Sequence, residues 1–235
     1  MKMKMKNLLI IILSAILFSS CQNDSISPNN LPGIYENGYF VTNEGNFGTG
    51  NGSISYVSEN GNVENNIFSQ INSFQLGDVV HSMNIIDEKA YIVVNNSSKI
   101  EVANIDSMSS IATIQGLISP RYIEKVANNK AYVTDWGING IQVIDLTSNT
   151  IISTISTGTG PEELVVTNGY AYVCNVGGWE LDNSVSIIDV NSDMVVSTLE
   201  IGDKPNSAVV DANGNVWVLT GGYTEYDANW NVVSE

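Results

Sequence analysis

One pattern recurs along the chain, and this repetition restricts the possible folds more than any other feature of the sequence. Each copy is a short apolar run that has an aromatic residue near its start and is followed by Asn, Asp or Gly. The clearest copies are EKAYIVVNN from Glu88, NKAYVTDWG from Asn129, GYAYVCNVGG from Gly169 and GNVWVLTGG from Gly214. Their aligned aromatics, Tyr91, Tyr132, Tyr172 and Trp217, are 41, 40 and 45 residues apart, and an earlier copy places Tyr39 a further 52 residues upstream. A period of this length indicates a fold built from repeated units.

Each repeat predicts four antiparallel strands. In the copy at 160–202, the runs GPEELVVT, AYVCN, SVSIIDV and MVVSTLEIG are short, β-branched and separated by Asn, Gly, Asp and Ser. No segment between them has the length or the capping residues of a helix. A four-stranded unit of about 40 residues is typical of a β-propeller blade. We therefore predict an all-β propeller, with an irregular β-sandwich as the alternative fold.

The repeats predict an incomplete ring of about four to five blades. The first blade, 38–77, lacks a full inner strand, three complete blades follow at 78–117, 118–158 and 159–202, and a fifth begins at Asp203. Ring closure pairs the first and last segments of a propeller and so removes the free sheet edges. We therefore expect 34–235 to form one propeller domain that lacks about two blades of a seven-blade ring at its C-terminus.

The first 33 residues have the layout of an export signal followed by a tether. MKMKMK is basic, NLLIIILSAILF is apolar, and SSC places small residues directly before Cys21. This arrangement resembles a bacterial lipobox, which implies removal of residues 1–20 and lipidation of Cys21. A plain signal peptide and a short membrane anchor are the alternatives. Residues 21–33 are polar and contain two prolines, which is typical of a flexible tether.

The charge and the cysteine content narrow the classes of partner and chemistry. The 235 residues carry a net charge of -16 at pH 7, and an acidic surface repels the phosphate backbone of nucleic acid. The chain has two cysteines, so lipidation of Cys21 would leave Cys174 without a disulfide partner. Cys174 lies in the apolar run AYVCNV, which predicts a buried and unreactive thiol.

The repeats resemble those of a known family. FVTNEGN, AYVTDWG and SVSIIDVNSDMVVSTLEIG are similar to YVTN-type (YncE-like) propeller repeats, and the resemblance extends over about 38–218. Together with the lipobox, the opening FVTNEGNFG and the late GNVWVLTGGY resemble Bacteroidota surface lipoprotein propellers, which include cobalamin-binding proteins. The resemblance implies a lipoprotein of the outer membrane, exposed at the cell surface or facing the periplasm, that captures a ligand such as cobalamin (vitamin B12) for an outer-membrane transporter. A protein- or glycan-interaction scaffold is the alternative, because a fold alone does not fix a function.

Candidate binding residues lie in two sets of loops at one rim of the predicted propeller. The first set joins the second and third strands of each repeat, and the second set leads into the first strand. Most Asn and Gly residues there are explained by turn chemistry, but two tryptophans in Gly-rich loops are not. An aromatic and amide-rich rim suits a flat or ring-shaped ligand, or a glycan. The predicted ligand-binding residues are Asn43, Glu44, Phe47, His81, Arg121, Asp135, Trp136, Glu162, Asn175, Trp179, Asn206 and Tyr223.

The sequence gives little indication of catalysis. It contains no G-x-S-x-G or H-E-x-x-H motif, no Cys/His cluster and no D-x-D-x-D-G calcium loop. Glu162 and Glu163 are adjacent, so strand alternation should direct them apart, which makes them a poor acid–base pair. We therefore expect a protein that is not an enzyme and that needs no metal or cofactor. A quinone-dependent oxidoreductase is a weaker alternative.

Overall fold

The computed structural model describes Tyr35 and residues 37–234. The predicted signal peptide, Cys21 and the tether lie outside the described residues, and the described residues belong to one compact unit. Within the described part of the chain, no helix is long and apolar enough to cross a membrane.

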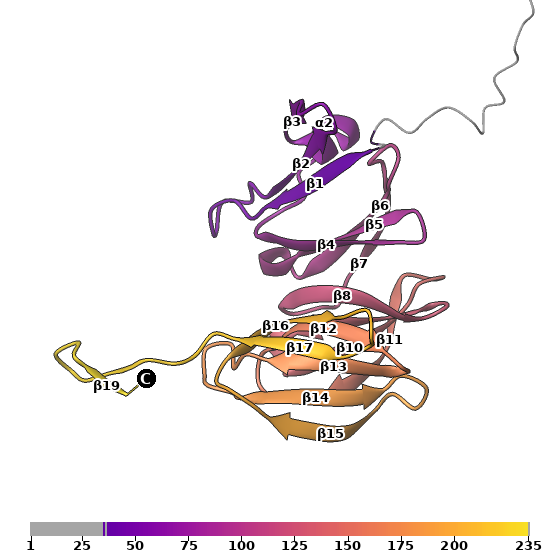
Figure 1. The fold of residues 1–235 in the computed structure, drawn as a ribbon. Helices are drawn as coiled ribbons and strands as arrows, with labels where there is room; N and C mark the ends of the chain where they lie inside the picture. The colour runs from indigo at the N-terminus through magenta and orange to yellow at the C-terminus, as the bar shows by residue number, and fades with distance from the viewer. Residues whose placement is uncertain (1–34, 36, 235) are drawn as a thin grey trace, which may run out of the picture. The chain divides into compact units, whose positions relative to one another are not determined.

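Three four-stranded antiparallel sheets form the centre of the fold, and we call them blades 2, 3 and 4 (Figure 1). Blade 2 consists of β4 (Val80–Ile86), β5 (Lys89–Val94), β6 (Lys99–Asn104) and β7 (Ser110–Ile114). Blade 3 consists of β8 (Pro120–Ala127), β9 (Lys130–Asp135), β10 (Gly140–Asp145) and β11 (Thr150–Ser156). Blade 4 consists of β12 (Pro161–Thr167), β13 (Tyr170–Asn175), β14 (Ser184–Asp189) and β15 (Met194–Glu200).

Two smaller sheets flank these blades. Blade 1 consists of β1 (Gly38–Asn43), β2 (Ser53–Ser58) and β3 (Val63–Glu64), and blade 5 consists of β16 (Pro205–Val210) and β17 (Val216–Thr220). In the repeat pattern β1 aligns with the second strands β5, β9 and β13, so among the described residues blade 1 has no strand in the first position. A further hairpin, β18 (Glu225–Tyr226) and β19 (Val232–Ser234), forms a two-stranded sheet of its own.

The first strands of successive blades pack against one another. β4 contacts β8, β8 contacts β12, and β12 contacts β16, while the remaining strands of each blade follow outward in sequence order. Successive four-stranded antiparallel sheets joined through their first strands are the arrangement of a propeller. The predicted all-β propeller fold is therefore confirmed.

One short helix departs from the prediction that no segment would be helical. The helix α2 (Ile67–Asn72) follows β3, which is only two residues long. Ile67 and Phe68 are buried, and the Phe68 ring meets the Phe74 ring edge-on at 5.3 Å between centroids. Burial of these two apolar side chains over blade 1 stabilises a helix that is too short to be stable by itself.

The core is divided among the interfaces between blades. One cluster of buried side chains joins blades 1 and 2, a second joins blades 2 and 3, and a third joins blades 3 and 4. The repeated aromatic of the second strand belongs to this packing, since Tyr91 and Tyr132 are buried and each hydroxyl donates to the next blade, to Asn149 and Asp193 respectively. The equivalent Trp217 in blade 5 is 64% exposed. Burial of the repeated aromatic therefore depends on a following complete blade.

Cys174 is fully buried in β13, and burial, followed by the charges of Glu163 and Glu162, raises the pKa of its thiol to about 12. A thiol with this pKa is almost entirely protonated at pH 8, and only the thiolate is nucleophilic. In a Cys21→Ser variant, where Cys174 is the one remaining cysteine, we expect no reaction with a thiol reagent at pH 8 until urea unfolds the chain. Labelling of the folded protein at the rate of the unfolded one would contradict this expectation.

Candidate ligand-binding rim

The loops at one end of blades 1 to 4 surround an open depression of about 700 Å³, which we call the rim pocket. Its walls come from the loops that join second and third strands and from the loops that enter first strands, as the repeat pattern predicts. The lining residues are Glu44, Gly45, Phe47, Val79, Asn95, Ser119, Arg121, Trp136, Gly137, Asn139, Thr159, Gly160, Gly177, Gly178, Trp179 and Glu180.

Carboxylates that accept backbone hydrogen bonds fix the loops around the rim pocket. Asp135 accepts hydrogen bonds from the backbone N–H groups of Ile118, Ser119 and Gly137 at 2.8–2.9 Å. In the next blade, Asp182 accepts from the backbone N–H groups of Thr159 at 2.7 Å and Ser184 at 2.9 Å. Each carboxylate therefore ties the entry loop of its blade to the loop between the second and third strands.

Asp78 connects loops of blades 1 and 2 in the same way. Its Oδ2 accepts from the Gly48 backbone N–H at 2.8 Å and from Asn96 Nδ2 at 2.5 Å. The hydrogen bond from Asn96 lowers the pKa of Asp78, and those from the Gly48, Thr49 and Gly50 backbone add to this effect against the opposing influence of desolvation. These acids hold loops in place, so part of the acidity of the chain is structural.

Aromatic side chains form much of the wall of the rim pocket. The rings of Trp136 and Trp179 meet edge-on, with 6.2 Å between their centroids. The Arg121 guanidinium carbon lies 4.2 Å from the centroid of the Trp136 ring, which is a cation–π contact. Trp179 is 97% exposed and Phe47 is 79% exposed, although both are large apolar side chains.

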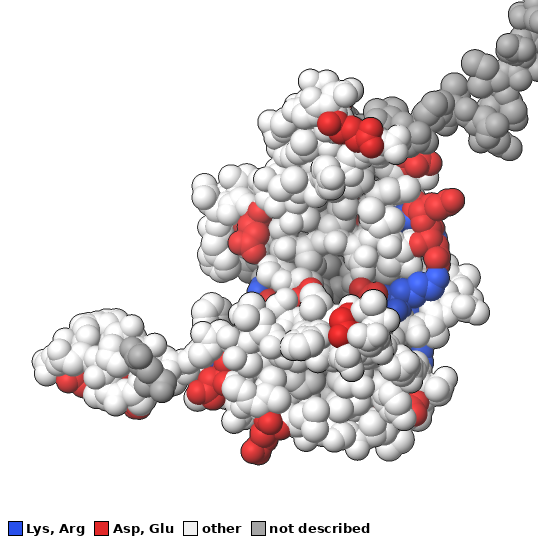
Figure 2. All heavy atoms as spheres, in the orientation of Figure 1, with Lys and Arg blue, Asp and Glu red and all other residues white. Residues whose placement is uncertain are grey.

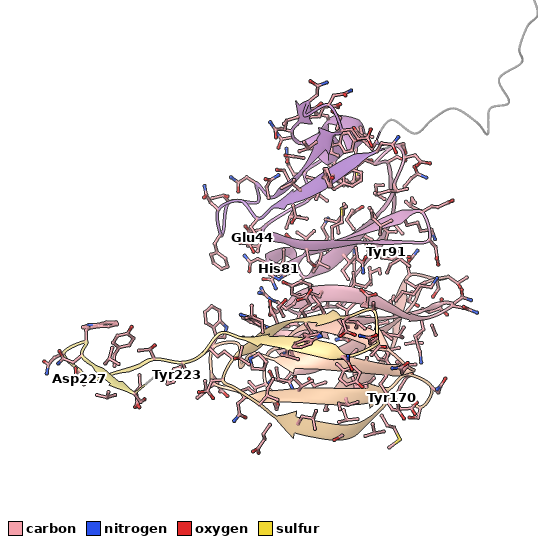
Figure 3. The ribbon with its side chains drawn as sticks, viewed as in Figure 1. Glu44, His81, Tyr91, Tyr170, Tyr223 and Asp227 are labelled. Carbon is pink, nitrogen blue, oxygen red and sulfur yellow. The ribbon has the colours of Figure 1, made fainter. Side chains whose placement is uncertain are left out.

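A charged network extends from the walls of the rim pocket to residues behind them and links blades 1 to 4. Glu162 accepts from Arg121 Nε at 3.0 Å and from Arg121 Nη2 at 2.8 Å, which is a two-pronged ion pair. His81 Nε2 lies 3.5 Å from Glu162 Oε1, and His81 Nδ1 lies 3.1 Å from Glu44 Oε1. Figure 3 shows Glu44 and His81 next to each other at the loop end of β4. The ion pair neutralises the charge of the one arginine in the sequence.

Comparison with known proteins places the chain in a family. Residues 37–226 match the model of a domain of unknown function, DUF5074. The chain belongs to this family. No curated protein sequence matches the DUF5074 chain.

The structural neighbours of this DUF5074 chain share its fold at low sequence identity. Hydrazine synthase from Kuenenia stuttgartiensis is 19% identical over 92% of this chain and 62% of its own, with a TM-score of 0.64. A protein of unknown function from Bacteroides caccae is 12% identical over 86% and 78%, with a TM-score of 0.58. The WD40 propeller domain of Doa1 is 14% identical over 71% and 53%, with a TM-score of 0.55. At these identities the likenesses show the propeller fold alone, and the chain spans less than two thirds of the first neighbour.

The rim pocket brings together five of the twelve predicted binding residues, Glu44, Phe47, Arg121, Trp136 and Trp179. His81 and Glu162 lie beneath the pocket in the charged network and do not line it. Asn206, at the start of blade 5, and Tyr223, which follows β17 on the segment toward β18 (Figure 3), do not line the pocket either.

The prediction was wrong for two residues that end second strands. Asp135 and Asn175 are fully buried in the DUF5074 fold, so neither side chain is accessible to a ligand. Asn175 Nδ2 donates to Ser184 Oγ and Ser186 Oγ, each at 3.0 Å, inside blade 4. Asn43 has a similar role in blade 1, where its Nδ2 donates to Ser55 Oγ at 3.0 Å. The Asn175 and Asn43 side chains therefore join the second strand of their blade to the third.

Several lining residues were not among the predicted ones, and glycines are the clearest examples. Gly160 and Gly178 have φ values of +58°, and a Cβ on Gly160 would lie 2.2 Å from the Gly178 backbone nitrogen. A Cβ on Gly178 would lie 3.5 Å from Trp136. The two loops approach this closely because these residues lack side chains. The Gly177–Gly178 pair directly before Trp179 is the sequence signal that would have identified them.

Glu162 and Glu163 bind different partners, as strand alternation predicts. Glu163 Oε2 accepts from Ser207 Oγ at 2.5 Å and from the Ala208 backbone N–H at 3.2 Å, both in blade 5, whereas Glu162 binds Arg121 of blade 3. Among the described residues, no three His, Cys, Asp or Glu side chains are grouped so that they would hold a metal ion.

We expect the contribution of Glu162 to the free energy of unfolding to decrease at acid pH. Burial raises the pKa of Glu162, but the two hydrogen bonds from Arg121 and the nearby charges of Arg121 and His81 outweigh burial and lower the pKa below its ordinary value of 4.5. A lowered pKa means that the stabilisation is present above pH about 4.5 and is lost as the pH falls through the lowered value. In urea unfolding, the difference in free energy between the wild type and Glu162→Gln should therefore be larger at pH 7 than at pH 3. An equal difference at both pH values would refute this role.

Proposed function

We propose that this DUF5074 propeller is a non-catalytic binding protein that captures a ligand in the rim pocket. The observation that carries the proposal is the exposure of Trp179 and Phe47 on the walls of that pocket, next to an arginine-stacked Trp136. Exposed rings of this size contribute little to the packing of the blades, whereas a ligand that covers them would bury a large apolar area.

The chemistry of the rim pocket favours a flat ligand with polar groups at its edge. Trp179 and Phe47 offer ring faces, and Arg121 and Asn139 offer hydrogen-bonding groups in the same walls. Acidic side chains are spread over the face shown in Figure 2 and basic ones are few, which disfavours a polyanion. Cobalamin suits this description because its corrin ring is broad and carries peripheral amides.

A surface lipoprotein is the setting that this function implies. Lipid on Cys21 would hold the propeller at the outer membrane, where a captured cobalamin could pass to an outer-membrane transporter. This part of the proposal rests on the N-terminal sequence. A Cys21→Ala variant should leave the membrane fraction, and unchanged membrane association would reject anchoring through this cysteine.

Isothermal titration of the protein with cyanocobalamin tests the proposed ligand. We expect saturable binding with one site per chain and quenching of tryptophan fluorescence over the same concentration range. Titration without heat or quenching at millimolar cyanocobalamin would reject cobalamin as the ligand.

A glycan is the second candidate, and the exposed Trp179 ring favours it as well. Sugar rings stack on exposed aromatic faces, and the Glu44 and Glu180 carboxylates in the pocket walls can accept hydrogen bonds from hydroxyl groups. A glycan array distinguishes the two candidates. If the wild-type protein binds a glycan but not cobalamin, and the Trp179→Ala variant no longer binds that glycan, the pocket is assigned to carbohydrate.

A further inference from the structure

Glu162 lies where the two walls of the rim pocket meet, but it is not part of either wall. Its side chain is 9% exposed and does not line the pocket. It nevertheless has one partner on each side, Arg121 of blade 3 and His81 of blade 2. A buried carboxylate between two such partners has a restricted choice of geometry, because each departure leaves a buried charge unpaired.

The first wall depends on Arg121. Two of its nitrogen atoms, Nε and Nη2, donate to Glu162, and this fork fixes the plane of the guanidinium group. The same group stacks on Trp136 at 4.2 Å, and Trp136 in turn meets Trp179 edge-on. Among the described residues, Arg121 Nη1 has no hydrogen-bond partner, so its N–H groups remain available to a ligand.

The second wall depends on His81. One nitrogen of its ring faces Glu162 and the other faces Glu44, in the loop of blade 1 that also carries Phe47. The ring is held from a third side by Tyr122, whose ring it meets edge-on at 5.0 Å. A displacement of His81 would therefore release Glu44, whose side chain is 59% exposed and has no other hydrogen-bond partner among the described residues.

We propose that Glu162 is a positioning residue that holds both walls of the rim pocket in register. It fixes Arg121 over Trp136 on one side and orients His81 toward Glu44 on the other, and it does so without touching the ligand. Removal of its charge would leave Arg121 free to swing away from Trp136 and would add an unpaired positive charge to the pocket.

The test compares Glu162→Gln with Glu163→Gln in the full chain. The two residues are adjacent in β12, but Glu163 binds Ser207 and Ala208 of blade 5 and does not line the rim pocket. Both variants are made with Trp217→Phe and Trp230→Phe, which leaves Trp136 and Trp179 as the only tryptophans. Acrylamide quenching of fluorescence and near-ultraviolet circular dichroism then report on these two rings without any ligand.

Because Trp179 is already 97% exposed, the change should come from Trp136. We expect Glu162→Gln to raise the quenching constant of the Trp136 component about twofold and to weaken the near-ultraviolet signal of the tryptophans, while Glu163→Gln leaves both at parent values. Equal quenching and equal near-ultraviolet spectra in the parent and in Glu162→Gln would overturn the proposal. If far-ultraviolet circular dichroism shows that Glu162→Gln is unfolded, Arg121→Lys decides, because lysine keeps the charge but cannot form the two-pronged bond. It should then reproduce the change in quenching, and parent quenching would overturn the proposal.

Ligand binding gives a second measurement that rests on the proposed function. Where the parent binds cyanocobalamin, Glu162→Gln should weaken the affinity at least tenfold and Glu163→Gln less than twofold. Parent binding with equal affinity in Glu162→Gln would overturn the positioning role. An absence of binding in the parent rejects cobalamin, and the ligand-free fluorescence still decides the role of Glu162.

Discussion

Replacement of Tyr132 by alanine should lower the free energy of unfolding by about 3–5 kcal/mol, the range for truncating a large aromatic side chain in a core. Tyr132 is fully buried between blades 3 and 4, in the cluster that contains Val143 and Leu164. Its hydroxyl also donates to Asp193, whose carboxylate accepts from Lys130 Nζ at 2.6 Å. The loss therefore combines a cavity with a broken hydrogen bond. Urea unfolding monitored by circular dichroism measures the effect.

Two further variants separate the parts of this effect. Tyr132→Phe keeps the ring and should cost about 1–3 kcal/mol, because it removes only a hydrogen bond to a charged group. Trp217→Ala changes the same repeat position in blade 5, where the ring is 64% exposed. It should lower the free energy of unfolding by about 1 kcal/mol or less. A Trp217→Ala cost equal to that of Tyr132→Ala would show that packing between blades does not set the stability.

The double variant Trp136→Ala with Trp179→Ala should weaken ligand affinity by about 10- to 100-fold, because each stacked ring contributes on the order of 1 kcal/mol or more. Trp179→Ala alone should weaken binding without a change in stability, since its side chain is almost wholly exposed. Titration with cyanocobalamin, or with the glycan that the array selects, measures the affinity.

Trp230→Ala is the matched control for the tryptophan pair. Trp230 is 82% exposed but lies between β18 and β19 and does not line the rim pocket, so its removal should leave affinity at the wild-type value. If the double variant binds as well as Trp230→Ala, the two rings have no part in the binding site.

The repeat made the fold predictable because packing between blades imposes the same requirements on each copy. An aromatic at Tyr91 and again at Tyr132 reports a buried position in a second strand, and the turn residues between runs report the strand ends. The helix α2 escaped prediction because it occurs in one blade only, where the outer strand β3 is two residues long. Its stability comes from burial of Ile67 and Phe68, which local sequence signals do not reveal.

The candidate site was predictable only in part. Position in the repeat identified Trp136, Trp179 and Arg121, because rim loops are free to vary. It could not separate surface from interior among the polar residues, and so it placed Asp135 and Asn175 on the rim although both are buried. The pairing of Glu162 with Arg121 joins residues 41 positions apart in neighbouring blades, and that contact depends on how the blades pack.

The carboxylates that fix the rim loops have a consequence for comparing the repeats of this chain with one another. Asp78 lies in an entry loop, Asp135 ends a second strand, and Asp182 lies within the following loop, yet all three bridge loops through backbone N–H groups. Residues at different positions in the repeat therefore make the same kind of connection between loops. An alignment of the repeats would place these acids in different columns and would suggest adaptation to different ligands, whereas each acid makes the same connection between loops.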